Sequence, residues 1–237
     1  MSILIESKKL KHSGWIPAFL GAGVVAALVP ILNMAVRSEN YVHLAGEPLQ
    51  ILLNANWDMI AMLNVLLIVT GACIMYHIEY EDRGFLKMST LPAHKNRLFL
   101  GKNFLLTAGA SGMLLLEGVS LGFCMANWFG IKEDFIQTLI KNTLYLIVLT
   151  LPAVMTMMII AALFQNMWVS LGIGVICVFT ATMLPDNQIV FSLFPFAMPF
   201  QTIYRGHVFL YIAAAITETA VFAGIGWIIE KIKNTAV

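Results

Sequence analysis

Long apolar runs are the feature of this sequence that most limits how it can fold. Six runs carry almost no charge, and each is close to the roughly 20 apolar residues that a helix needs to cross a bilayer. The runs cover residues 15–36, 57–77, 103–126, 138–163, 167–184 and 208–229. Charged residues make up 11% of the chain, against about 25% in soluble domains. The sequence therefore predicts an all-α, polytopic membrane protein, a single transmembrane domain over residues 1–237 with six spans.

One charged segment interrupts this pattern between the second and third runs. Eight of the chain's 27 Asp, Glu, Lys and Arg residues fall within residues 76–102. Charged side chains are costly inside a bilayer, so we expect this segment to lie in water. It is large enough to dock onto another protein.

The distribution of Lys and Arg predicts the orientation, because short cytoplasmic loops carry an excess of both. With both termini inside, ten Lys and Arg residues lie on the inner side and four on the outer side. The inner ones are Lys8, Lys9, Lys11, Arg83, Lys87, Lys95, Arg97, Lys102, Lys231 and Lys233; the outer ones are Arg37, Lys132, Lys141 and Arg205. We therefore expect both termini and the charged segment in the cytoplasm, at the plasma membrane. The first run resembles a signal peptide in its basic flank, but it is long and no A-x-A site follows, which favours a retained helix.

Two further segments have unusual patterns. In residues 1–14, Ile3, Leu10 and Gly14 roughly share one helical face, and the charged residues are Glu6, Lys8, Lys9 and Lys11. This pattern fits a short amphipathic helix on the inner membrane surface as well as it fits a basic flank that only fixes topology. Residues 185–207 contain an apolar stretch, 189–200, that is too short to cross and is broken by Pro195 and Pro199. We expect short helices that dip into the outer leaflet and return; the alternative is an ordinary outer loop with an aromatic anchor.

No motif for catalysis or nucleotide binding occurs in the chain. Gly101-Lys102 lacks the upstream glycine and the following Ser or Thr of a phosphate-binding loop, so we expect no ATP hydrolysis by this chain. The five histidines are scattered and form no HExxH, so we expect no metal and no bound cofactor. Three cysteines lie in apolar runs and are most simply small hydrophobes. The net charge of +1 gives no indication of a nucleic-acid partner.

Four polar residues within or beside the spans are candidates for a substrate path or for contacts between helices. They are Asn33, Asn64, Glu117 and Glu218. Carboxylates at bilayer depth usually face the bundle interior or water, so the two glutamates either line a path or are protonated and bonded to a neighbouring helix. For the two asparagines, hydrogen bonding between helices is the favoured interpretation. Gly118 and Gly122 form a GxxxG pattern that permits close helix approach.

The charged segment resembles the first cytoplasmic loop of ABC-2 type transporter permeases. The resemblance rests on an acidic-basic-glycine turn, an amphipathic stretch, a Leu-Pro pair, a basic patch at 94–97 and Lys102 opening the next span. The residues that it marks for coupling to an ATPase are Glu79, Glu81, Asp82, Arg83, Gly84, Phe85, Leu86, Met88, Leu91 and Pro92. The six spans and short termini are also similar to that family, and within it to the small permeases of lantibiotic-immunity transporters.

The resemblance implies a function, partners and a mechanism. It implies a permease subunit of an ATP-driven exporter that expels lantibiotic or other amphipathic antimicrobial peptides. Its coupling segment, residues 79–102, would dock in a groove of a separate ABC ATPase, which uses ATP and Mg²⁺, while a second permease, a different chain or a copy, completes the path. The apolar residues of the segment suit such helix-in-groove docking. The alternatives are an ABC-2 permease for another substrate such as a lipid, an intramembrane enzyme, or a membrane scaffold or sensor.

Overall fold

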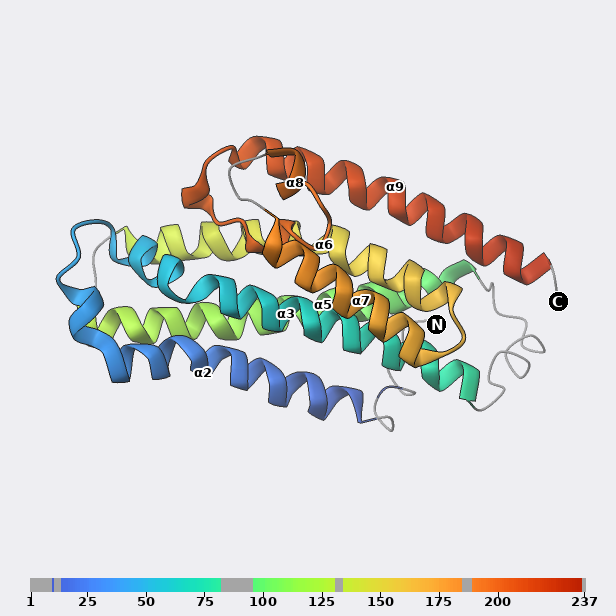
Figure 1. The fold of residues 1–237 in the computed structure, drawn as a ribbon, viewed down its shortest axis with the longest axis horizontal. Coiled ribbons are helices and arrows are strands. Elements are labelled where there is room, and N and C mark those ends of the chain that lie inside the picture. The colour runs from blue at the N-terminus through green and yellow to red at the C-terminus, as the bar shows by residue number, and fades with distance from the viewer. Residues whose placement is uncertain (1–9, 11–13, 82–95, 131–133, 185–188, 236–237) are drawn as a thin grey trace.

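The computed structural model describes residue 10 and residues 14–81, 96–130, 134–184 and 189–235, and all regular structure within these ranges is helical (Figure 1). The long helices are α2 (Trp15–Val42), α3 (Pro48–Glu81), α5 (Asn96–Cys124), α6 (Phe135–Leu163), α7 (Met167–Met183) and α9 (Val208–Thr235). The short ones are a π-helical turn η1 (Met125–Phe129), α8 (Ile189–Ser192) and two 3₁₀ turns, η2 (Met198–Phe200) and η3 (Ile203–Arg205).

Successive long helices run in opposite directions along one bundle, which gives it two distinct ends (Figure 1). The terminal end holds the start of α2, the α3–α5 connection, the α6–α7 turn and the end of α9. The distal end holds the α2–α3 turn, the end of η1, the start of α6 and the described residues between α7 and α9. The predicted charged segment therefore joins two helices at the terminal end, and the Pro-broken segment lies at the distal end.

Five of the described helices are long and apolar enough to span a membrane: α2, α3, α5 with η1, α6 and α9. The sixth expected span corresponds to α7, an apolar helix of 17 residues. At about 1.5 Å per residue it is roughly 25 Å long, slightly less than the 30 Å hydrocarbon core of a typical bilayer. The structure thus supports a helical bundle with five evident spans, and α7 alone lies at the limit of length.

The helices begin and end beyond the apolar runs of the sequence. The second was expected over 57–77, but α3 begins at Pro48, because proline lacks the amide hydrogen that a first helical residue leaves unbonded in any case. The first was expected to end at Val36, and α2 deviates from helical geometry at the next residue, Arg37, before one more turn. Asn166 starts α7 by accepting a hydrogen bond from the Trp168 amide at 3.0 Å.

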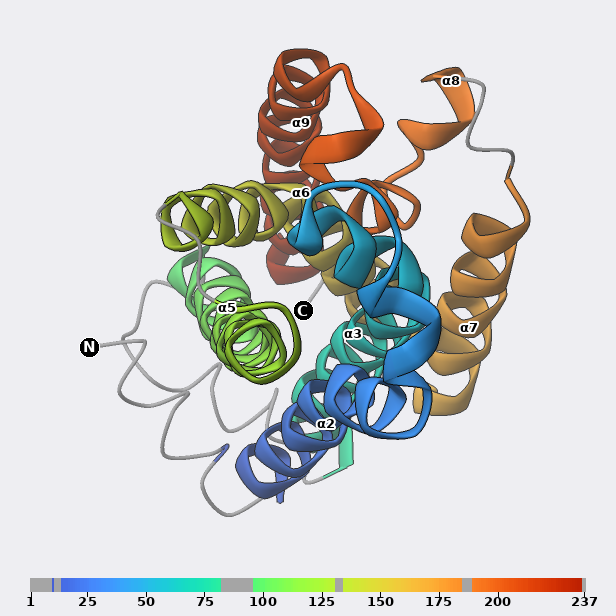
Figure 2. The same ribbon diagram turned by 90° about the vertical axis from the view of Figure 1, so that its left-hand side faces the viewer.

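The α3 helix is the central element of the bundle. It packs against α2, α5, α6 and α7, and the view along the bundle shows it between them (Figure 2). Side chains fit over glycines at these contacts: the Phe19 ring of α2 lies against both Gly71 of α3 and Gly109 of α5. Gly174 of α7 packs against Val69 of α3. Close approach at small residues is the usual packing mode of membrane helices.

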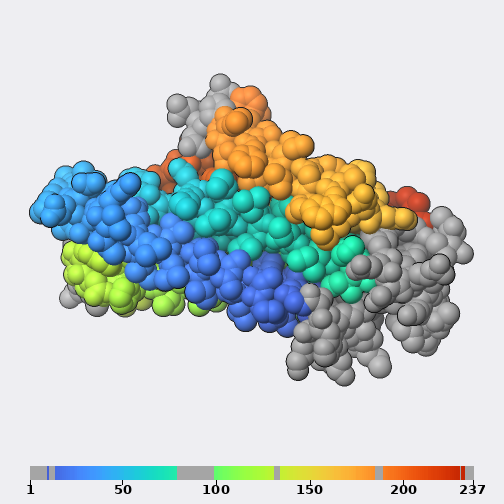
Figure 3. Space-filling model, turned by 60° about the horizontal axis from the view of Figure 1, so that its bottom comes forward, coloured from blue at the N-terminus to red at the C-terminus, as the bar shows by residue number. Residues whose placement is uncertain are grey.

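Part of the bundle surface is apolar and exposed. On α2, the side chains of Leu20, Val24, Leu28 and Leu32 recur every four residues and are exposed, which places them in one stripe along the helix. The face seen in Figure 3 is formed mainly by α2, α3 and α7, with the end of α5 at one side. On α9, only 11% of the apolar window is buried. Lipid or another protein must cover these surfaces, because a soluble monomer rarely exposes such patches.

Candidate functional site

The predicted coupling residues flank the α3–α5 connection. Glu79 and Glu81 belong to the last turns of α3, at the terminal end of the bundle. The remaining members of the set lie outside the described residues: Asp82, Arg83, Gly84, Phe85, Leu86, Met88, Leu91 and Pro92. Most of the entry segment, residues 1–14, also lies outside them. The structure therefore fixes where the coupling segment leaves and re-enters the bundle, and its docking role stays a prediction.

A buried lysine lies beside the base of this connection. Lys102, in the second turn of α5, is 2% exposed, and its Nζ lies 4.1 Å from the centre of the Tyr76 ring on α3. A buried ammonium group requires such compensation, and an aromatic face supplies it through a cation–π contact. The sequence analysis used Lys102 as an inner-side charge and as the residue that opens the third span, but no local pattern shows which ring it meets. This contact links the two helices that carry the charged segment.

The structure joins two of the four predicted polar residues in the middle of the bundle. Asn64 Nδ2 of α3 donates a hydrogen bond of 2.9 Å to Glu117 Oε2 of α5, and both residues are almost fully buried. Asn64 Oδ1 and Glu117 Oε1 have no hydrogen-bond partner among the described residues. The pair holds α3 against α5, and its role in a substrate path stays a prediction.

The other two predicted residues lie apart from this pair. Asn33 Nδ2 of α2 donates to Asn56 Oδ1 of α3 at 2.7 Å, and Asn56 Nδ2 donates to the Leu52 carbonyl at 2.9 Å. Asn56 was not singled out in the sequence, because it precedes the apolar run assigned to the second span. Glu218, on α9, is half-buried, and within the described part of the chain its Oε2 has no partner. The four residues do not form one common site.

Three side-chain contacts join residues 189–207, called the distal segment from here on, to the first three turns of α3 and to Glu47, which precedes α3. Trp57 Nε1 donates to the Pro199 carbonyl at 3.0 Å. Arg205 Nη2 lies 2.7 Å from Asp58 Oδ1 in an ion pair. A further bond joins Tyr204 to Glu47: the Tyr204 hydroxyl donates to Glu47 Oε2 at 2.9 Å. Burial and the Glu47 carboxylate raise the pKa of Tyr204 well above its usual range, so the phenol remains a hydrogen-bond donor at neutral pH.

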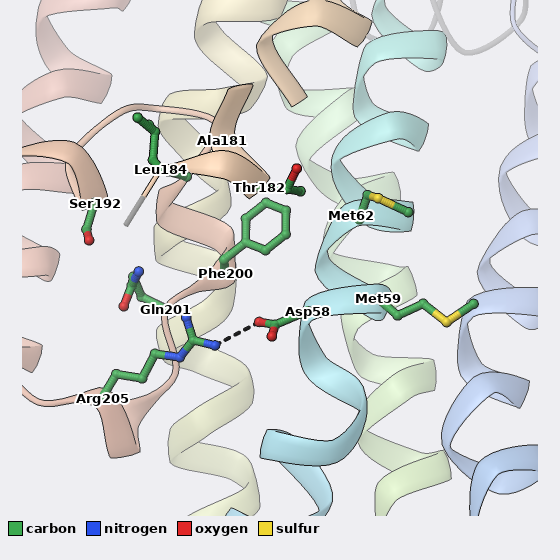
Figure 4. A pocket seen from close by; sticks show the side chains of 11 residues that line it. Asp58, Met59, Met62, Ala181, Thr182, Leu184, Ser192, Phe200, Gln201 and Arg205 are labelled. Carbon is green, nitrogen blue, oxygen red and sulfur yellow. Dashed lines mark hydrogen bonds and ion pairs between the residues drawn. The ribbon is translucent and has the colours of Figure 1, made fainter. Parts of the chain in front are cut away.

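A pocket of about 320 Å³ lies at the distal end, and of these three contacts the Asp58–Arg205 pair belongs to its lining (Figure 4). Its walls come from α3, from the end of α7 and from the distal segment around η2 and η3. Met62, Ala181 and Phe200 provide apolar surface, and Gln201 with the Asp58–Arg205 pair provides polar groups (Figure 4). The residues come from three parts of the chain that are far apart in sequence, so no sequence pattern could indicate this pocket.

Metal ligation finds no support in the described residues. No group of three or more His, Cys, Asp or Glu side chains in them is close enough to hold an ion. Cys73, Cys124 and Cys177 are free thiols within helices. The polar chemistry of the described bundle is hydrogen bonding and ion pairing between helices.

Comparison with known proteins places the chain in a family. No curated protein and no solved structure matches it. The model of one family, described as ABC-2 family transporter protein, matches residues 2–181. That match covers more than half of the chain and includes the charged segment and the helices on both sides of it. Such permeases are multi-pass membrane proteins that work with an ABC ATPase. The chain therefore belongs to the ABC-2 family of transporter proteins.

Proposed function

We propose that this chain is the membrane permease of an ATP-driven exporter in the plasma membrane, with both termini in the cytoplasm. The observation that carries the proposal is the placement of the charged segment. It joins α3 and α5 at the end of the bundle that also holds the start of α2 and the end of α9. In the sequence, ten of the fourteen Lys and Arg residues precede α2, lie between residues 82 and 102, or occur in the last turns of α9, and an excess of basic residues marks the cytoplasmic side.

The proposed cargo is a lantibiotic or another amphipathic antimicrobial peptide. The support is the similarity of the charged segment and of the short chain to immunity permeases. In this proposal α7 is the sixth span and residues 185–207 re-enter the outer leaflet. Irregular backbone is tolerated at membrane depth where protein covers it, and Trp57 and Asp58 of α3, together with Glu47, hold the described part of this segment against the bundle. The chain binds no cofactor; ATP and Mg²⁺ are used by the partner ATPase.

Coupling in this scheme depends on the two helices that carry the segment. A push on residues 79–97 reaches α3 and α5, which are bridged by Lys102 over the Tyr76 ring and by the Asn64–Glu117 hydrogen bond. Two helices bridged at two levels move as one body, and rigid-body motion of packed helices is a common way to transmit such a change.

The experiment combines partner capture with two substitutions in the segment. The tagged chain is isolated in mild detergent, and the bound proteins are identified by mass. Arg83→Glu and Phe85→Pro are then compared with Lys141→Glu, a charge reversal at an exposed residue near the distal end of α6. We expect an ATPase to be recovered with the native chain and with Lys141→Glu. The two segment variants should remain in the membrane but lose both the ATPase and the resistance of cells to the peptide.

The outcomes separate the alternatives. Recovery of a second permease of different sequence supports the immunity type, and recovery of the ATPase without peptide resistance indicates an exporter of another substrate. If the native chain is recovered without any ATPase after crosslinking through residues 83–95, the exporter is refuted and the enzyme and scaffold interpretations return.

A further inference from the structure

We propose that the distal pocket is a binding site for the headgroup of a zwitterionic phospholipid, one that carries a phosphate and an ammonium group. This inference goes beyond the proposed export function and takes from that proposal only that α7 spans the membrane. It rests on the depth of the pocket, on an amide that lines it without a hydrogen bond to the described residues, and on a charge pair at its edge.

The pocket lies at the level of the lipid headgroups. The helix α7 is roughly 25 Å long, which is less than the hydrocarbon thickness of about 30 Å. If α7 starts at one boundary of the hydrocarbon core, it ends just short of the other. Ala181 and Thr182, in its last turn, form one wall of the pocket. The opening is therefore placed where acyl chains meet their polar heads.

The side-chain amide of Gln201 is the polar group in the pocket best placed to bind a ligand. Gln201 is 3% exposed and lines the pocket, and among the described residues its side chain forms no hydrogen bond. The amide does not belong to the fully buried polar atoms that lack a partner, so it is open to the pocket that it lines. A ligand oxygen in the pocket would accept a hydrogen bond from this amide.

The charge pair supplies both signs that a zwitterion requires. The Asp58 side chain is 68% exposed and that of Arg205 is 25% exposed, with 2.7 Å between Oδ1 and Nη2. A ligand ammonium would meet the accessible Asp58 carboxylate, and a phosphate would lie near the Arg205 guanidinium and the Gln201 amide. Figure 4 shows these three side chains together on one side of the pocket. Charge-assisted hydrogen bonds of this kind are stronger than neutral ones.

The remaining wall suits an acyl chain. Met59, Met62 and Phe200 line the pocket, and Met59 is 56% exposed, so apolar surface continues from the pocket to the outside of α3. Methionine adapts to irregular apolar shapes. A pocket of about 320 Å³ is at the lower end of the size range of small-molecule sites, which fits a headgroup better than a whole lipid.

The test measures lipid retention by the purified full-length chain, using native mass spectrometry from detergent micelles. Three probes share the same dioleoyl chains: phosphatidylethanolamine, phosphatidylglycerol, which lacks the ammonium, and diacylglycerol, which lacks the phosphate. We expect phosphatidylethanolamine to be retained about tenfold more than phosphatidylglycerol, the effect of one hydrogen bond between charged groups. Diacylglycerol should be retained least.

Matched variants assign the effect to the pocket. Asp58→Asn should lower the retention of phosphatidylethanolamine to that of phosphatidylglycerol, and Gln201→Leu should lower both. Glu47→Gln is the control, because Glu47 bonds Tyr204 at the same end of the bundle and does not line the pocket; it should leave retention unchanged. Gln201→Leu removes an amide that has no hydrogen bond to the described residues, so it should fold normally even if Asp58→Asn does not.

Three results would overturn the proposal. The first is equal retention of the three probes, and the second is retention that survives both pocket variants. The third is retention of a cationic amphipathic peptide in place of any phospholipid, lost in Gln201→Leu, which would make the pocket a peptide site. No step requires the ATPase, so failure here leaves the export proposal untouched, and failure of export leaves this test valid.

Discussion

The contact between α7 and α3 at Gly174 allows a sharp test of the packing. A Cβ at Gly174 would lie 2.5 Å from Val69 Cγ1 and 3.0 Å from Met157 Sδ. Val69 and Met157 are both fully buried. Valine is stiff at χ1, so the α3 side cannot yield, whereas methionine adapts. Gly174→Ala should therefore force α7 away from α3.

The magnitude follows from overpacking. Extra atoms in a packed core cost about 1–3 kcal/mol, and alanine gains at most about 1 kcal/mol over glycine in helix propensity. We expect Gly174→Ala to lower the free energy of unfolding by about 1–2 kcal/mol. The propensity gain of alanine offsets little of the overpacking cost, because the separated helices stay helical in detergent. Gly172→Ala is the control on the same helix, because no neighbouring atom lies within 4 Å of its Cβ position. It should change stability by less than about 0.5 kcal/mol.

The assay is unfolding by sodium dodecyl sulfate in mixed micelles, followed by tryptophan fluorescence. A second substitution, Val69→Ala, removes the two methyl groups that obstruct the new Cβ. The double variant Gly174→Ala with Val69→Ala should then be more stable than the sum of the single effects, by a coupling energy of at least about 0.5 kcal/mol. Equal effects at Gly172 and Gly174, or strict additivity with Val69→Ala, would refute the close approach of α7 and α3.

Three further predictions concern the polar contacts. Asn64→Leu should destabilise the bundle by about 1–3 kcal/mol in the same assay, because it leaves the buried Glu117 side chain without its donor; no loss would contradict the bond. Trp57→Phe removes the hydrogen bond to the distal segment, and hydrogen exchange at residues 198–201 should rise about fivefold for a loss of roughly 1 kcal/mol, with unchanged exchange as the opposing result. The Tyr204–Glu47 hydrogen bond should persist through neutral pH and weaken only as the pH rises above the usual tyrosine pKa of about 10. The reason is that the raised pKa of Tyr204 favours the protonated phenol in the folded protein. A Tyr204 absorbance change at the ordinary tyrosine pKa would contradict this prediction.

The sequence predicts the helices well because each apolar run is long. It predicts their ends poorly, because a helix in a bundle extends beyond the hydrocarbon wherever another helix continues to pack against it. Pro48 and the apolar residues after it belong to α3, yet they precede the run assigned to the second span. Asn56 was missed for the same reason, although it is buried and bonded to Asn33.

The candidate site was harder to predict from the sequence than the fold. A polar residue within an apolar run is easily recognised, so Asn64 and Glu117 could be singled out. No local sequence pattern shows that their side chains meet between two helices. The pocket is a stronger case, because Asp58, Thr182 and Gln201 come together only after α3, α7 and the distal segment have packed. Gln201 reads as an ordinary loop residue in sequence. Gln201 becomes a candidate only through its burial in the pocket lining, and the sequence alone does not show that burial.

The packing of the described helices limits where the proposed cargo can pass. Phe19 lies against Gly71 and Gly109, Gly174 lies against Val69, and fully buried side chains such as Ile60, Ile68 and Leu106 belong to one core. A path through this interior would require the separation of helices that pack closely against one another at glycine residues. The exposed stripe of α2 has no such partner within the described bundle. The α9 helix packs against α6 and, at Gly226, against Phe99 of α5, but only 11% of its apolar window is buried. The exporter proposed above therefore requires a path along the outside of this chain, closed by a second permease.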